Sequence, residues 1–170
     1  FLQRGYDQVV HDICLQNLPV VFAIDRAGMV GEDGPTHAGA FDLSFLRALP
    51  NLAILAPRDD CDLRAMLEWA LAQPGPVAIR YPRDKAATIG DAGVRDISRG
   101  EILHHGADAM FLAVGSLVRA CLKAAELLEC EGVSAGVADA RWIKPLDVAL
   151  LDALASVPLI TVEENALMGG

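Results

Sequence analysis

Apolar residues along this chain concentrate in short runs, and between the runs they recur at three- and four-residue spacing. The runs occupy residues 20–24, 52–56, 77–81, 110–114, 133–137 and 159–162. Runs of this length, bounded by glycine, proline or charged residues, are typical of buried strands. The stretches between them predict helices over residues 1–16, from 41 to 46, and over 58–72, 115–130 and 147–155. Alternating strands and helices imply parallel sheets with helical crossovers, so the chain is predicted to be an α/β protein.

The alternation is interrupted once. Residues 85–100 mix small and charged residues without any sustained periodicity, which predicts a linker. We therefore expect two doubly wound domains with mainly parallel sheets, over residues 1–84 and 101–170. The first helix has no capping residue before it and the second domain has few elements, so both domains are expected to be truncated.

Composition excludes some classes of function. The chain has 170 residues with a net charge of −9, so no basic stripe is available for nucleic acid. No apolar run reaches the length of about 18 residues that a membrane span needs, and no signal segment opens the chain. We expect a cytoplasmic protein that binds neither membranes nor nucleic acid. The four cysteines are scattered singly, which predicts buried free thiols rather than a metal site or disulfides.

The richest concentration of chemical groups is Val-Gly-Glu-Asp-Gly-Pro-Thr-His at residues 30–37. This stretch follows the predicted strand 20–24, and Arg26 lies just beyond the end of that strand. Arg83 follows the predicted strand 77–81 in the same way. Ligands of open α/β sheets bind at the carboxyl ends of strands. Two arginines, an aspartate and a histidine there predict a site for an anionic, oxygen-rich substrate.

Several segments resemble the 1-deoxy-D-xylulose-5-phosphate synthase family, thiamine diphosphate enzymes of the transketolase superfamily. They are Phe-Leu-Gln-Arg-Gly-Tyr-Asp-Gln at 1–8, Ala-Ile-Asp-Arg-Ala-Gly at 23–28, Gly-Glu-Asp-Gly-Pro-Thr-His at 31–37, Gly-Ala-Phe-Asp-Leu-Ser at 39–44, Arg-Tyr-Pro-Arg at 80–83 and Trp-Ile-Lys-Pro-Leu-Asp at 142–147. The segment at 31–37 also occurs in transketolase, so its flanks distinguish the synthases. The resemblance covers the whole chain but only part of a synthase.

The resemblance implies both an architecture and an activity. The chain would be the later part of a pyrimidine-binding domain, followed by most of a transketolase C-terminal-like domain. Enzymes of this family are homodimeric transferases that use thiamine diphosphate and Mg2+. They condense pyruvate with glyceraldehyde 3-phosphate, release carbon dioxide and supply isoprenoid and thiamine synthesis. Their activating glutamate and their diphosphate and metal site would lie upstream of residue 1, so the chain alone is expected to be inactive.

The resemblance also implies roles for single residues. Arg26 and Arg83 match positions that bind the substrate phosphate, and a guanidinium suits phosphate because it makes paired, charge-assisted hydrogen bonds. His37 matches a catalytic histidine that can exchange a proton with the aldehyde oxygen. Asp33 matches an aspartate that contacts the acceptor substrate.

Two residues near the start of the chain match cofactor contacts. Phe1 would pack against the aminopyrimidine ring, and Arg4 would lie one helical turn further on, near the cofactor and substrate. Asp84 departs from the family, which has glycine at this position. The resemblance therefore does not fix the conformation of the loop beside the substrate phosphate.

Other interpretations remain open for these residues and for the chain. Each arginine could form a surface ion pair, and Asp33 could cap its own turn. His11, His104 and His105 are interpreted as structural or solvated, the last two in a loop. The segment 163–165 is either structural or part of a subunit contact. The alternatives for the whole chain are a transketolase, a 2-oxoacid dehydrogenase β-type subunit or a non-catalytic dimerisation fragment.

Overall fold

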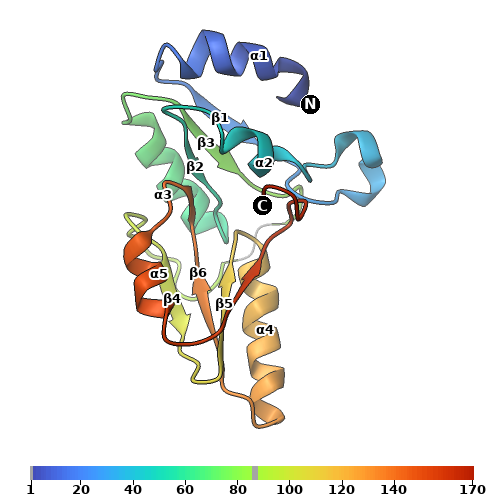
Figure 1. The fold of residues 1–170 in the computed structure, drawn as a ribbon, viewed down its shortest axis with the longest axis vertical. Coiled ribbons are helices and arrows are strands. Elements are labelled where there is room, and N and C mark those ends of the chain that lie inside the picture. Colours follow the sequence, from blue (N-terminus) through green and yellow to red (C-terminus); the bar gives the residue numbers. More distant parts are fainter. Residues whose placement is uncertain (1, 86–87) are drawn as a thin grey trace.

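The computed structural model describes residues 2–85 and 88–170, and these form two α/β units that follow one another along the long axis of the molecule (Figure 1). Each unit is built on a four-stranded sheet, with strand orders β1-β3-β2-β7 and β4-β6-β5-β8. Most strand pairs are parallel, and one pair in each sheet is antiparallel. The predicted α/β class with two domains is confirmed.

The first sheet has three parallel strands, β1 (Val21–Ile24), β3 (Val77–Arg80) and β2 (Ala53–Leu55). Its helices are α2 (Asp42–Leu46) and α3 (Asp60–Leu71). Leu43 and Leu46 of α2 and Ile54 of β2 belong to one buried cluster, because the apolar faces of the helix and the sheet meet there. The carboxyl ends of β1 and β3 lie side by side at one edge of this unit, since the two strands are parallel neighbours.

The fourth strand of this sheet, β7 (Trp142–Lys144), was not predicted. It comes from the chain beyond the linker and pairs antiparallel with β2. The first sheet is therefore completed by the second half of the chain.

The second sheet consists of β4 (Glu101–His104), β6 (Ala135–Asp139), β5 (Ala109–Ala113) and β8 (Leu159–Val162). Its helices are α4 (Leu117–Cys130) and α5 (Val148–Leu154). β4 was also missed, and His104 lies at its end rather than in the expected loop. β4 begins with Glu101 and ends with His104, so its sequence forms no apolar run; the strand lies at the edge of the sheet, antiparallel to β6.

The first predicted helix lies where it was expected, but it is not a regular α-helix. Its described part comprises a 3-10 turn at Leu2–Gly5, α1 (Tyr6–Gln8) and a π-helix at Val9–Cys14. Glycine and β-branched residues weaken a regular α-helix in this stretch. The wider π-helical turns are visible in the hydrogen bond from Leu15 N to the carbonyl of Val10, at 2.9 Å.

The four cysteines are free thiols, as expected, but only Cys14 and Cys121 are buried; Cys61 is half-buried and Cys130 is exposed. Within the described part of the chain, none of the helices has both the length and the apolar character needed to cross a membrane.

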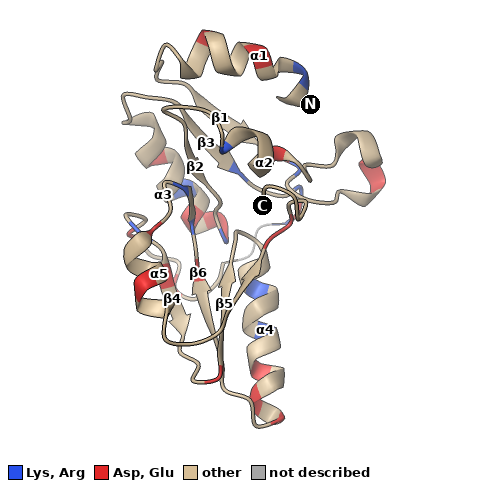
Figure 2. Ribbon diagram, in the orientation of Figure 1, with Lys and Arg blue, Asp and Glu red and all other residues tan. Residues whose placement is uncertain are grey.

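A cluster of mostly buried charges joins the two units between the start of α3 and the end of β6 (Figure 2). Its members are Arg58, Asp59, Asp62, Arg95, Glu101, Asp139 and Arg141. Nη1 of Arg58 lies 2.8 Å from a carboxylate oxygen of Glu101 and 3.3 Å from one of Asp139. The cluster therefore holds the start of α3 against the second sheet through ion pairs.

Candidate active site

A loop of residues 28–39, called the site loop below, projects from the carboxyl end of the first sheet; it is the blue loop at the right of Figure 1. Gly28 and Gly39 close its neck by pairing with each other. The amide of Gly39 donates to the carbonyl of Gly28 at 2.9 Å, and that of Gly28 donates to the carbonyl of Gly39 at 3.4 Å. Between them the chain makes two 3-10 turns, Gly31–Asp33 and Pro35–His37. The site loop is therefore closed at its base and carries both Asp33 and His37.

The neck of the site loop is packed too tightly for a side chain at Gly39. A Cβ there would lie 2.3 Å from the carbonyl oxygen of Arg26. The carbonyl of Gly39 accepts a 2.7 Å hydrogen bond from Nη2 of Arg80, the last residue of β3. Arg80 is buried, and its Nε lies 3.6 Å from Oδ2 of Asp42. The strand that leads to Arg83 thus also holds the neck of the site loop.

Asp33 connects the two arginines that the sequence singled out. Its Oδ2 accepts a 2.9 Å hydrogen bond from Nε of Arg26, and its Oδ1 accepts one from Nη1 of Arg83. Arg26 also pairs with its neighbour Asp25. The hydrogen bond from Arg83, with that from Arg26, holds the pKa of Asp33 below its ordinary value, and Asp33 raises the pKa of Arg83.

This cluster is open to solvent on one side. The side chain of Asp33 is 19% exposed, that of Arg26 27% and that of Arg83 53%. Each guanidinium has five N–H donors, which is more than a single carboxylate accepts. Arg26 and Arg83 therefore keep donors for a second anionic partner. The arrangement can therefore hold a phosphate at the mouth of the site.

His37 lies at the end of the second 3-10 turn, half-buried. Its Nδ1 lies 2.9 Å from Oγ1 of Thr36. His37 and Arg26 line the same cavity, which has a volume of about 510 Å³ and follows β1. Leu2, Phe22 and Ile24 contribute an apolar part of its wall. The cavity thus places an imidazole and a guanidinium beside an apolar surface.

Of the two predicted cofactor contacts, Arg4 is among the described residues. Leu2 and Gly5, on either side of Arg4, line the cavity, but Arg4 is exposed and does not. Phe1 lies outside the described residues.

Comparison with protein families gives a match over each half of the chain. The pyrimidine binding domain of transketolase matches residues 1–88, and the transketolase C-terminal domain matches residues 98–170. The chain belongs to the transketolase family.

Within this family, curated relatives extend over the whole chain. It is 55% identical over 174 residues to the 1-deoxy-D-xylulose-5-phosphate synthase of Carboxydothermus hydrogenoformans, and 50% identical over 175 residues to that of Dictyoglomus thermophilum. Both alignments cover 100% of this chain, and the chain spans 28% of the length of these relatives. The resemblance of the sequence to these synthases is confirmed.

Solved structures of the transketolase family share the fold. A split-gene transketolase, solved as an inactive β4 tetramer, superposes with a TM-score of 0.89 at 33% identity, covering 98% of this chain and 55% of that one. The transketolase of Campylobacter jejuni superposes with a TM-score of 0.81 at 26% identity, covering 96% of this chain and 27% of that one. The two sheets and their order are thus shared with transketolases.

The cavity of this transketolase-family chain fits the pyrimidine ring of a thiamine cofactor but not a diphosphate-bound metal. Its apolar wall at Leu2, Phe22 and Ile24 suits a flat heteroaromatic ring, which gains from apolar contact. Among the described residues, the group whose side chains could hold a metal is Asp59, Asp60 and Cys61. That group lies at the start of α3 and does not line the cavity. The chain therefore offers a surface for the pyrimidine ring, and the described residues of the cavity offer no carboxylate cluster for a diphosphate-bound metal.

Sequence reasoning missed the residues that support the site loop. Arg80 was noticed only as part of the Arg-Tyr-Pro-Arg segment, although an arginine as the last residue of a buried strand is itself a signal, because such a charge needs a partner. Asn165, which reaches the site region from the second unit, carries no local signal of that role.

Proposed function

We propose that this chain is the central to C-terminal part of an enzyme that condenses pyruvate with glyceraldehyde 3-phosphate to 1-deoxy-D-xylulose 5-phosphate, with release of carbon dioxide. The observation that carries the proposal is the cluster of Arg26, Asp33 and Arg83 at adjacent strand ends, in which Arg26 lines the same cavity as His37. Similarity to the named synthases over the whole chain supports it. The enzyme serves isoprenoid and thiamine synthesis in the cytoplasm and acts as a homodimer.

Arg26 and Arg83 bind the phosphate of glyceraldehyde 3-phosphate in this proposal. Asp33 already orients both guanidinium groups, so little side-chain freedom is lost when the phosphate binds. Its carboxylate also accepts a hydrogen bond from a hydroxyl group of the acceptor. The three residues fix the position of the aldehyde through its two polar ends.

His37 exchanges a proton with the aldehyde oxygen as that oxygen becomes a hydroxyl group. The hydrogen bond between Nδ1 and Thr36 fixes the orientation of the ring. Thiamine diphosphate, when bound with Mg2+, supplies the electron sink for the carbon that pyruvate contributes. Phe1 packs against its pyrimidine ring, and Arg4 lies near the cofactor.

The proposal divides the chain into part of a pyrimidine-binding domain over residues 1–84, a linker over 85–100 and a C-terminal domain over 101–170. It also assigns the diphosphate and metal site, and the activating glutamate, to the part of the enzyme outside these residues. The 170 residues alone are then inactive.

The test is turnover by a full-length synthase that carries these residues. Formation of 1-deoxy-D-xylulose 5-phosphate and carbon dioxide should require pyruvate, glyceraldehyde 3-phosphate, thiamine diphosphate and Mg2+ together. The isolated chain, assayed in parallel, should give no product. Transfer from a ketose phosphate donor in place of pyruvate would instead identify a transketolase, and turnover by the isolated chain would refute the assignment of the cofactor site.

A further inference from the structure

The segment that follows β8, residues 163–166, lies against the base of the site loop although it belongs to the second unit. A Cβ at Gly28 would lie 2.6 Å from Cβ of Glu164, so the side chain of Glu164 packs directly against the backbone at Gly28. At the other side of the neck, the amide of Ala166 donates a 2.6 Å hydrogen bond to the carbonyl of Ala40. The segment therefore contacts the chain on both sides of the loop neck.

Asn165 makes the most specific of these contacts. Its Oδ1 accepts a hydrogen bond from the amide of Leu43 at 3.2 Å, and its Nδ2 donates to Oγ of Ser44 at 2.8 Å. The first amides of a helix have no partner within the helix. Phe41, the residue before α2, has no side chain that can accept from them. Asn165 therefore supplies from the second unit the cap that α2 lacks.

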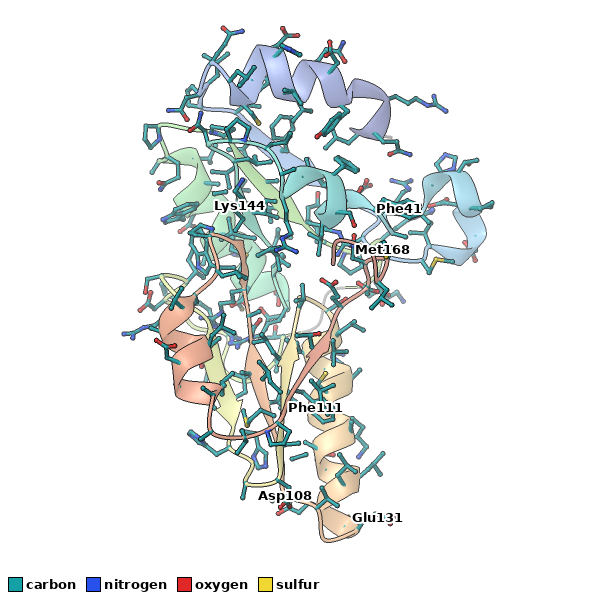
Figure 3. The ribbon with its side chains drawn as sticks, viewed as in Figure 1. Phe41, Asp108, Phe111, Glu131, Lys144 and Met168 are labelled. Carbon is teal, nitrogen blue, oxygen red and sulfur yellow. The ribbon has the colours of Figure 1, made fainter. Side chains whose placement is uncertain are left out.

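The contact continues along the chain beyond Asn165. Oγ of Ser44 donates a 2.8 Å hydrogen bond to the carbonyl of Met168. Figure 3 labels Phe41 and Met168, which lie together where the C-terminal segment meets the base of the site loop. Lys144, also from the second half of the chain, is labelled well away from them and holds the other end of α2, with Nζ 3.0 Å from the carbonyl of Arg47.

We propose that Asn165 is a positioning residue for the substrate site: by capping α2 and fixing the neck of the site loop, it sets where Asp33 and His37 lie. This inference rests on the proposed function for the effect on substrate, but the effect on the loop itself is independent of it. The C-terminal unit thus acts on the reaction through the shape of the loop, without touching the substrate.

The first test is hydrogen–deuterium exchange of residues 28–40 in the full-length protein. Asn165→Ala should make these amides exchange about five- to tenfold faster, as expected for the loss of one helix cap. Lys144→Met is the matched control, because it removes a contact from the second half of the chain at the opposite end of the same helix and should leave exchange in the site loop unchanged. Unchanged exchange in Asn165→Ala, or an equal rise in both variants, would overturn the inference.

Ser44→Ala provides the same test where Asn165→Ala does not fold. It removes the acceptor of the Asn165 amide and the donor to Met168, while the cap on Leu43 remains. A smaller rise in exchange, confined to the site loop, is expected. No change in the loop in this variant would count against the inference.

The second test separates positioning from general stability. In Asn165→Ala the KM for glyceraldehyde 3-phosphate should rise at least about threefold, with the KM for pyruvate unchanged. Lys144→Met should leave both values unchanged, even where it lowers the melting temperature. Equal shifts of both KM values in Asn165→Ala would reduce Asn165 to a structural residue. If the unmodified enzyme makes no 1-deoxy-D-xylulose 5-phosphate, the proposed function fails, while the exchange result still decides whether Asn165 positions the loop.

Discussion

Arg83 donates a hydrogen bond to the carboxylate of Asp33, a residue 50 positions earlier in the chain. The contact joins the loop after β3 to the site loop after β1, because the two strands are parallel neighbours. It also means that an incoming phosphate meets a guanidinium that is already oriented by an acid. The phosphate must then share Arg83 with Asp33, so the binding energy reflects the difference between two anionic partners.

Arg83→Ala in the full-length synthase should raise the KM for glyceraldehyde 3-phosphate about 10- to 100-fold. This is the range expected for losing a charge-assisted hydrogen bond of about 1.5–3 kcal/mol. The KM for pyruvate should stay near its original value, because pyruvate carries no phosphate. Steady-state kinetics with each substrate varied in turn measures both values.

Two further variants serve as comparisons for the kinetics of Arg83→Ala. Arg83→Lys should recover part of the loss, since an ammonium keeps the charge but not the planar fork. Arg64→Ala, which removes an exposed arginine of α3, should change neither KM. Equal increases for both substrates in Arg83→Ala would contradict a phosphate-binding role.

Gly39→Ala should lower the free energy of unfolding of the chain by about 1–3 kcal/mol, the usual cost of forcing an extra methyl group into a closely packed site. The new methyl group would meet the backbone carbonyl of Arg26, which cannot rotate away as a side chain can. Gly93→Ala is the control, because a Cβ at Gly93 would meet nothing within 4 Å. Urea unfolding of both variants measures the difference, and equal midpoints would refute the tight neck of the site loop.

Much of the fold was predictable because most of the strands carry a local signal of their own. Residues 77–81 and 159–162 are short, mostly apolar runs, and the strands lie at Val77–Arg80 and Leu159–Val162. β7 could not be predicted, because a strand of three residues has no measurable periodicity and owes its existence to pairing with β2. A strand such as β7, which the second half of the chain adds to the first sheet, depends on a tertiary contact that no local pattern contains.

The candidate site also has a part that could be predicted from the sequence and a part that could not. Arg26, Asp33 and Arg83 could be selected from their place after predicted strands and from the motifs around them. That Asp33 pairs with both arginines could not be predicted, because the pairing depends on the path of the site loop. The same holds for Asn165, whose partner Leu43 is 122 residues away.

Asp59→Ala should cost about 3 kcal/mol of unfolding free energy, within the range for removing one partner of a buried ion pair. One oxygen of Asp59 caps α3 by accepting from the amide of Asp62, at 2.9 Å. The other accepts from Nη2 of Arg95, at 3.0 Å, and the variant would leave that guanidinium without this carboxylate. Urea unfolding of the chain measures the loss.

Asp147→Ala is the matched comparison for Asp59→Ala. Asp147 caps α5 by accepting from the amide of Leu150, at 3.0 Å, and its other oxygen accepts from the amide of Gly100 rather than from an arginine. The expected loss is about 1 kcal/mol, typical of a helix cap. If the two variants lose the same amount, the ion pair of Asp59 with Arg95 contributes nothing to stability.

Asp139 predicts an unusual dependence of stability on pH. It is fully buried at the end of β6, and burial raises its pKa to about 7. Its Oδ2 lies 3.3 Å from Arg58 and 3.3 Å from Arg141, whose charges favour the ionised form, while Asp62 opposes it. The pKa of Asp62 is raised by burial as well. Three arginines face four carboxylates in this cluster, so one proton on Asp139 balances its charge.

Whether stability rises or falls with pH depends on which state, folded or unfolded, holds the extra proton. Between the ordinary pKa of 3.8 and about 7, the folded chain keeps a proton on Asp139 that the unfolded chain has lost, so this group's contribution to stability falls as the pH rises. It is complete below that window and lost above it, with a slope of at most about 1.4 kcal/mol per pH unit. Asp139→Asn stays neutral and should remove this slope, whereas Asp152→Asn, at an exposed position of α5, should keep it. Unfolding free energies from about pH 5 to about pH 8 decide the matter: parallel curves for the unmodified chain and Asp139→Asn would mean that Asp139 is ionised in the fold throughout, held by its two arginines.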